Sequence, residues 1–130
     1  NRSQLIRIPA AEGDFSRMEL RSPDPSSNPY IAFALLINAG LDGVEEKAAL
    51  TAPVDIDIYN STDEELKGLH SLPQSLKEAI EYAENSVFVK NTLGQSMLNK
   101  YIHIKKKENT EFQAAQNKWD FYCAKYFKTI

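Results

Sequence analysis

An alternation of charges near the beginning of the chain could hold anions together with a metal ion. Arg17, Glu19 and Arg21 occur at every second position. Side chains two residues apart lie on one face of a strand, about 6.6 Å apart at a rise of roughly 3.3 Å per residue. In such an arrangement the carboxylate offers hard oxygen to Mg²⁺, and the two guanidinium groups offer forked donors to phosphates or carboxylates. Such a face suits phosphoryl transfer, in which positioning and charge neutralisation dominate catalysis.

The type of basic residue supports an anion site in the same region. All four arginines, at positions 2, 7, 17 and 21, precede all eleven lysines. Arginine binds phosphate or carboxylate through two parallel hydrogen bonds, whereas lysine is a hydrated point charge suited to an exposed surface. We therefore expect Arg2 and Arg7 to extend the same basic surface. The alternative interpretation is a ladder of surface salt bridges, which contributes little to stability.

Two short strands are expected to position these side chains. Residues 5–8, with the sequence Leu-Ile-Arg-Ile, are typical of a strand and are followed by Pro9. Residues 17–21 form the second expected strand, and a turn over residues 10–16 joins the two. The seven-residue connection suggests an antiparallel pair, although it is long for a tight hairpin.

The remainder of the chain is predicted to be mostly helical, which gives an α+β fold class. After a proline-rich break, Asn28 and Pro29 are typical of a helix start, and the helix is expected to be buried and to end at Gly40 or Gly43. Residues 48–62 are expected to be irregular, with a strand over residues 54–59 as the alternative. Further helices are predicted to begin at Thr62, to cover residues 75–84 and 86–91, and to run from Gly94 to near the end of the chain.

Aromatic residues continue along the last predicted helix at helical spacing, a pattern typical of a core or of a subunit interface. The set comprises Phe112, Trp119, Tyr122, Tyr126 and Phe127. We expect the part from Trp119 to Phe127 to be partly exposed in a monomer and to drive association.

Composition excludes several classes of protein. The chain has 130 residues, 42% of them apolar and 25% charged, which excludes a collagen-like or wholly disordered protein. Its longest apolar run, residues 30–37, is too short to cross a membrane. One cysteine, Cys123, excludes an internal disulfide and indicates a reducing compartment, so a cytoplasmic location is expected. The net charge of −3 argues against nucleic-acid binding, and the lysines at 105–107 are interpreted as a solvated helix face.

Several segments occur in an order that is specific to one family. They are Asn1-Arg2-Ser3, Ile6-Arg7-Ile8-Pro9, Arg17-Met18-Glu19-Leu20-Arg21, Pro23-Asp24-Pro25, Asn28-Pro29-Tyr30 and Ala39-Gly40-Leu41-Asp42-Gly43. In this order they resemble the C-terminal part of the catalytic domain of bacterial type I glutamine synthetases. The resemblance continues more weakly to the closing helix. It implies that residues 1–130 are one fragment of that domain, with a strand pair in 1–21 and a helical remainder in 22–130. The first residue is Asn1, which agrees with a processed chain or an excised part of a longer one.

The resemblance implies an ATP-dependent ligation of ammonia to L-glutamate through a γ-glutamyl phosphate. It implies that Glu19 is a ligand of Mg²⁺ or Mn²⁺ and that Arg7 and Arg17 bind the phosphates of ATP. Arg21 would hold the carboxylate of glutamate, and Arg2 would act catalytically by contacting both glutamate and the transferring phosphoryl group. The other metal ligands and the nucleotide-base pocket of the family lie upstream of the matching segments. The isolated chain is therefore expected to be inactive.

The resemblance also implies a homo-oligomer, built in the family as a dodecameric double ring, with no nucleic-acid or membrane partner. Tyr59 falls where some members are adenylylated, but its neighbours lack the Leu-Tyr-Asp-Leu-Pro motif of that site. His70 and His103 are expected at the surface and not as ligands. Two alternatives stay open: a guanidino-kinase-like phosphotransferase with an arginine-rich phosphate cradle, and a non-catalytic helical association module.

Overall fold

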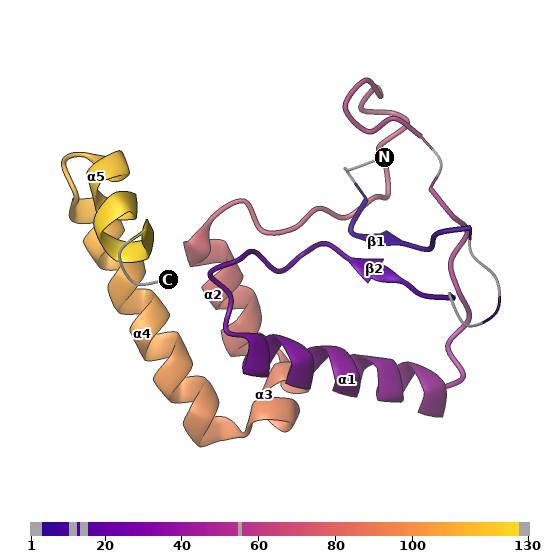
Figure 1. Cartoon of the computed structure of the whole chain (residues 1–130), viewed down its shortest axis with the longest axis horizontal. Coiled ribbons are helices and arrows are strands. Elements are labelled where there is room, and N and C mark those ends of the chain that lie inside the picture. The colour runs from indigo at the N-terminus through magenta and orange to yellow at the C-terminus, as the bar shows by residue number, and fades with distance from the viewer. Residues whose placement is uncertain (1–3, 11–12, 14–15, 55, 128–130) are drawn as a thin grey trace. The chain divides into compact units, whose positions relative to one another are not determined.

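The computed structural model describes residues 4–10, 13, 16–54 and 56–127. The chain divides into two compact units, the first built from residues 1–25 and 48–72 and the second from residues 26–47 and 73–130. The first unit holds a two-stranded antiparallel sheet, and the second holds the helices (Figure 1). The α+β class and the mostly helical remainder are therefore confirmed.

Strands β1, Ile6–Arg7, and β2, Glu19–Leu20, form the antiparallel pair in the first unit. Ile6 lies opposite Leu20, and Arg7 lies opposite Glu19. The backbone N–H of Arg21 donates to the carbonyl of Leu5 at 2.9 Å and extends the pairing by one further bond. The ladder is shorter than the strands predicted from the sequence. Proline has no N–H for a ladder bond, so the sequence Ile-Pro at positions 8 and 9 ends the pairing on that side.

Residues 48–72, the second part of the first unit, contain neither helix nor strand among their described positions. This confirms the irregular structure expected for residues 48–62. The helix predicted to begin at Thr62 is wrong. The hydrogen bonds of a capping box do form, since the backbone N–H of Thr62 donates to Glu65 Oε2 at 2.8 Å and the N–H of Glu65 contacts Thr62 Oγ1 at 3.4 Å. The backbone nevertheless turns away at Gly68, whose φ of 90° lies outside the helical region. Only a short run of turns results.

Helix α1, Pro29–Glu45, opens the second unit. The Asn28 side chain accepts from the N–H groups of Tyr30 and Ile31, which confirms the predicted helix start. The predicted end at Gly40 or Gly43 is wrong, because a glycine inside a helix costs only about 1 kcal/mol relative to alanine. The expected burial is also wrong, because no residue of α1 is buried. The helix packs against α3, and one apolar side stays in solvent. This stripe consists of Tyr30, Phe33, Ile37, Leu41 and Val44.

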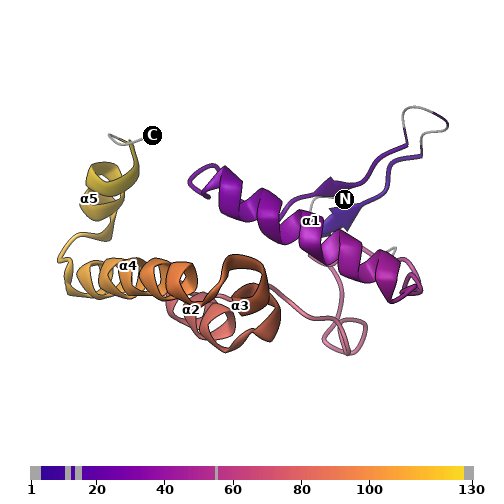
Figure 2. The same cartoon turned by 90° about the horizontal axis from the view of Figure 1, so that it is seen from below.

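Three helices form the core of the second unit: α2, Leu76–Asn85; α3, Val87–Leu93; and α4, Gln95–Ala114. Figure 2 shows α2 beside α4, the pair with the most extensive contact. Three buried side chains from these helices pack together, namely Ile80, Leu98 and Ile102. Ser75 and Ser86 each accept a backbone N–H at a helix start, so the expected helices over 75–84 and 86–91 are confirmed to within two residues.

The long closing helix expected from Gly94 is interrupted. After α4, Ala115 is extended with ψ of 128°, and Asn117 caps a new short helix, α5, Lys118–Tyr122. A π-helical turn, η2, follows at Cys123–Phe127. The Lys118 ammonium donates to the carbonyls of Gln113 and Ala115, both at 3.0 Å, and so satisfies the end of α4. The aromatic residues therefore lie on two helical segments instead of one.

Candidate functional site

Three guanidinium groups converge on the carboxylate of Glu19. Arg7 Nη1 lies 3.4 Å from Oε1 and 3.2 Å from Oε2. Arg17 Nη2 donates to Oε1 at 3.3 Å, and Arg21 Nη2 lies 3.5 Å from Oε2. We call these four residues the Glu19 cluster.

Local sequence and strand register together produce the Glu19 cluster. Arg17 and Arg21 are two residues before and after Glu19, so an extended backbone turns all three side chains to one face. Arg7 joins them from β1 because the antiparallel register places it directly opposite Glu19. Cβ atoms of directly opposed residues lie about 5 Å apart on the same face of a sheet. The common face of Arg17, Glu19 and Arg21 was predicted, whereas the pairing of Arg7 with Glu19 required the register.

The cluster carries more positive than negative charge. Three permanently charged guanidinium groups surround one carboxylate, which leaves an excess of two positive charges. The Glu19 side chain is 30% exposed, and Arg7 and Arg17 are about half exposed. Solutes can therefore reach the cluster from solvent. The cluster therefore has the chemistry of an anion-binding site with a carboxylate at its centre.

The surroundings of Glu19 keep its carboxylate ionised. The hydrogen bond from Arg7 lowers the pKa of Glu19 below its ordinary value, and the positive charges of Arg7 and Arg17 and the hydrogen bond from Arg21 act in the same direction. The desolvation caused by partial burial opposes them and is outweighed. Glu19 is consequently an anion at neutral pH, the form that can ligate a metal ion.

Glu19 fits a divalent cation as one ligand of a shared site. Mg²⁺ commonly takes one or two protein carboxylates and completes its shell with water and substrate phosphates. Within the described ranges, no group of three or more His, Cys, Asp and Glu side chains could hold a metal ion. His70 and His103 are exposed, as predicted. Arg2, the remaining predicted site residue, lies outside the described residues.

A second carboxylate with several donors was missed by sequence reasoning. Glu108 on α4 is only 5% exposed, and it accepts hydrogen bonds from the Tyr126 hydroxyl and from Lys105 Nζ, the latter at 2.9 Å. Burial raises the pKa of Glu108, but the hydrogen bonds from Tyr126 and Lys105 and the charge of Lys125 outweigh burial and lower the pKa overall. The sequence contained a signal, because steps of three and four from Leu98 through Ile102 and Lys105 lead to Glu108.

The lysines at 105–107 each face a carboxylate. Their ammonium groups lie 2.9 Å from Glu108, 2.7 Å from Glu84 and 3.9 Å from Glu111, respectively. Lys106 and Lys107 are exposed, as expected of a solvated helix face, whereas Lys105 is partly buried against Glu108 and departs from that expectation. In the part of the chain that the structure describes, no helix combines the length and the apolar character needed to span a membrane.

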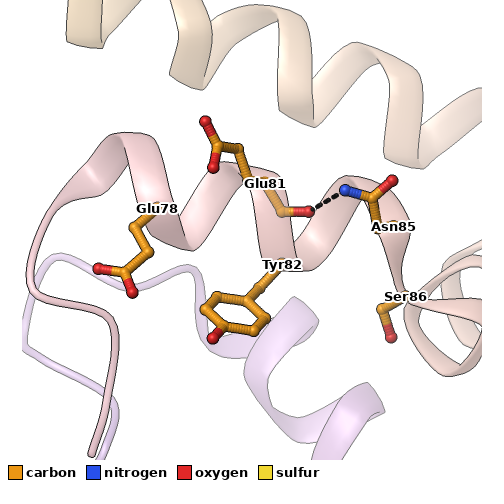
Figure 3. A pocket seen from close by; sticks show the side chains of 5 residues that line it. All are labelled: Glu78, Glu81, Tyr82, Asn85 and Ser86. Carbon is orange, nitrogen blue, oxygen red and sulfur yellow. Dashed lines mark hydrogen bonds between the residues drawn. The ribbon is translucent and has the colours of Figure 1, made fainter.

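A shallow pocket on α2 carries no independent chemistry (Figure 3). Three of the five side chains that line it already form hydrogen bonds at the helix ends. Glu78 accepts the backbone N–H of Gln74 at 2.8 Å, Asn85 donates to the carbonyl of Glu81 at 2.8 Å, and the Ser86 hydroxyl accepts the N–H of Val89 at 3.2 Å. These side chains are therefore interpreted as helix-terminating groups and not as a ligand site.

The aromatic residues near the end of the chain form a partly exposed surface. Phe112 on α4 contacts Phe121 and Tyr122, with ring centroids 5.6 and 5.4 Å apart. Trp119 and Phe127 contact each other with centroids 6.0 Å apart, and both are about two-thirds exposed. The predicted partial exposure of this segment is confirmed. We call Trp119, Tyr122 and Phe127 the aromatic surface.

Comparison with known proteins gives one consistent result. Residues 1–124 match the family model described as glutamine synthetase, catalytic domain. The chain is 44% identical to a glutamine synthetase of Methanosarcina mazei over 122 residues, which cover 92% of this chain and 27% of the relative. It is 43% identical to a glutamine synthetase of Thermotoga maritima over 122 residues, covering 92% and 28%. The chain thus spans just over a quarter of the length of these curated relatives.

Proposed function

Because the chain belongs to the glutamine synthetase catalytic domain family, we propose that it contributes part of an active site that ligates ammonia to L-glutamate with ATP. The observation that carries the proposal is the convergence of Arg7, Arg17 and Arg21 on Glu19. We place the chain in the C-terminal part of the catalytic domain. Within the family we propose the bacterial type I form, which the order of the matched segments favours, and a cytoplasmic location.

Each arginine of the cluster has a proposed ligand. Arg7 and Arg17, the more exposed pair, bind phosphate groups of ATP through forked hydrogen bonds. Arg21 holds the carboxylate of glutamate. Arg2 contacts both glutamate and the transferring phosphoryl group, and Glu19 ligates Mg²⁺ or Mn²⁺.

The chemistry of these residues is positioning and charge neutralisation. In the proposed reaction the terminal phosphoryl group of ATP passes to the side-chain carboxylate of glutamate, and ammonia then displaces phosphate from the acyl phosphate. Guanidinium groups bring the two anionic substrates together and offset the repulsion between them. A divalent cation held by Glu19 supplies further neutralisation of phosphate charge when it is bound.

Binding by the arginines can be tested by calorimetric titration with Mg–ADP. We expect Arg7→Lys and Arg17→Lys each to weaken binding about tenfold, because lysine keeps the charge but loses the fork. Lys67→Gln, which removes a positive charge from the same unit outside the cluster, should leave binding unchanged. Equal affinity of wild type and both arginine variants would contradict the proposal.

We propose that the chain alone does not catalyse the ligation. The described residues offer one carboxylate at the cluster, and a single carboxylate does not hold Mg²⁺ tightly. An assay of glutamine formation with ATP, Mg²⁺, glutamate and ammonia tests this. Turnover by the isolated chain would show that the chemistry has been placed at the wrong residues.

We also propose that the aromatic surface contributes to homo-oligomer assembly, as in the double rings of the family. Large exposed aromatic side chains are enriched at subunit interfaces. Light scattering should show association that weakens in a Trp119→Ser variant. A wild-type chain that stays monomeric at high concentration would count against this surface as an interface.

A further inference from the structure

We infer that the last helical segments form a conformational switch, in which α4 and α5 either fold back on each other, as observed, or join into one straight helix. A break separates the two helices in the bent form (Figure 1). The inference concerns the second unit and does not depend on the Glu19 cluster. It goes beyond the proposed function because it assigns a change of shape to the segment that carries the aromatic surface.

The sequence contains nothing that forces the helix to break. No glycine or proline occurs between positions 95 and 130, so the residues that most disfavour a helix are absent across the junction. The junction consists of Ala115, Gln116 and Asn117, of which alanine and glutamine are good helix formers. Helical spacing also continues through the junction, which is why the sequence predicts one long helix. The break is therefore held by side-chain contacts.

Two side chains at the junction stabilise the break. The Asn117 side chain accepts the backbone N–H groups of Trp119 and Asp120, at 2.9 and 3.3 Å, and so caps the start of α5. The Lys118 ammonium donates to three carbonyls at the end of α4. A continuous helix would pair backbone donors and acceptors at the junction with each other. The bent and the straight form therefore satisfy the same kinds of backbone group by different partners.

The contacts that hold η2 against α4 exclude a straight helix. Glu108 accepts a hydrogen bond from the Tyr126 hydroxyl, and Glu111 pairs with Lys125 at 3.1 Å. In a continuous helix, Tyr126 would lie 18 residues beyond Glu108, which is about 27 Å along the axis at 1.5 Å per residue. Lys125 would lie 14 residues beyond Glu111, or about 21 Å. The two forms are thus mutually exclusive, and no intermediate shape keeps both sets of contacts.

Straightening would rearrange the aromatic side chains. In the bent form the ring of Phe112 contacts those of Phe121 and Tyr122, with centroids 5.6 and 5.4 Å apart. In a straight helix these rings separate along the axis, and residues at alternating steps of three and four share one face. That face would consist of Phe112, Ala115, Trp119, Tyr122 and Tyr126. Straightening therefore converts an internal aromatic contact into a continuous stripe.

The distance between two spin labels reports which form is present. Positions 96 on α4 and 124 on η2 are exposed, and they can be labelled as Ser96→Cys and Ala124→Cys in a Cys123→Ser background. In the bent form η2 lies beside residues 108–111, so the labels should be about 20 Å apart along α4. A straight helix places them about 42 Å apart. We expect the short distance in this background.

Two variants should populate the straight form. Asn117→Ala removes the cap of α5 and places the best helix former at the junction, so we expect the long-distance fraction to rise about tenfold. Tyr126→Phe removes the hydroxyl that contacts Glu108 and should act in the same direction. It also provides a test if Asn117→Ala fails to fold. Asn91→Ala, the same chemical change on α3, should keep the original distances.

A proline distinguishes joining of the helices from fraying of α5. Ala115 has φ of −66° and ψ of 128°, a conformation that suits the residue before a proline, so Gln116→Pro fits the bent form. In a continuous helix the same proline would remove a backbone hydrogen bond and clash with the preceding turn. Added to Asn117→Ala, Gln116→Pro should therefore return the labels to the short distance.

Several results would overturn the inference. One is a short distance in both Asn117→Ala and Tyr126→Phe, and another is a long distance in the labelled background itself. A third is a broad distribution in Asn117→Ala that Gln116→Pro does not shorten, because α5 would then fray instead of joining α4. None of these results bears on Mg–ADP binding at the Glu19 cluster, so the proposed function stands or fails separately.

Discussion

Glu19 in the first unit and Glu108 in the second each collect several hydrogen-bond donors, but in opposite surroundings. Glu19 is 30% exposed and faces three arginines, so its cluster has an excess of positive charge. The Glu108 side chain is 6% exposed and accepts from one lysine and one neutral tyrosine hydroxyl, so lysine and carboxylate balance. The contrast shows that the number of partners of a carboxylate says little about its role.

Exposure and charge balance separate the two roles. The unbalanced, accessible Glu19 cluster suits exchange with a ligand. The balanced, buried contacts of Glu108 join α4 to the π-helical turn η2, since Tyr126 lies 18 positions further along the chain. An ion pair between Lys125 and Glu111, at 3.1 Å, also joins η2 to α4. Glu108 therefore ties η2 to α4.

The largest expected effect that distinguishes Glu108 from Glu19 is on the stability of the second unit. We expect Glu108→Gln to lower the free energy of unfolding of the second unit by about 2 kcal/mol, because the hydrogen bonds to a buried charged group are lost. Urea denaturation followed by the fluorescence of Trp119, the only tryptophan, measures this change. Glu19→Gln, in the other unit, should leave the same transition unchanged. Equal shifts in both variants would break the distinction.

A smaller effect is expected from pH. The pKa of Glu108 in the folded chain lies below its ordinary value, so the stabilisation is complete above that ordinary value and is lost as the pH falls toward the lowered pKa. The groups facing the carboxylate are Lys105 on α4 and Lys125 and Tyr126 on η2. Acid titration of Trp119 fluorescence should show a loss of stability that is reduced in Glu108→Gln. Identical acid profiles would show that Glu108 contributes nothing.

The smallest effect on stability is expected at the ion pair between Lys125 and Glu111. Glu111 and Lys125 are both about 40% exposed, and exposed ion pairs contribute little. Glu111→Gln should lower the free energy of unfolding by less than about 0.5 kcal/mol. A loss in Glu111→Gln as large as that in Glu108→Gln, measured by the same urea titration, would show that burial does not decide the strength of these contacts.

The sequence predicted the features that depend on neighbouring residues. Alternation placed Arg17, Glu19 and Arg21 on one face, and the serines at 75 and 86 marked helix starts. Prediction from the sequence failed where the structure depends on small energy differences or on contacts between residues far apart in the chain. The two glycines did not end α1, since about 1 kcal/mol per glycine is easily offset within a helix of this length. The capping box at Thr62 formed without a helix following it.

The candidate site was likewise predictable only where it depends on neighbouring residues. Residues on one strand could be grouped from their spacing, but Arg7 joined Glu19 through a register that no local pattern specifies. Glu108 was missed because the neighbouring lysines suggested a uniformly solvated face, while its partner Tyr126 lies beyond a helix break that depends on Asn117.

The exposed apolar side of α1 has a practical consequence for handling the chain. Five large side chains in contact with water favour precipitation when the protein is heated or concentrated. Thermal scans would then report the rate of aggregation instead of the unfolding equilibrium, and the apparent Tm would change with the scan rate. Dilute samples and chemical denaturants at low temperature are the conditions under which this polypeptide can be studied reversibly.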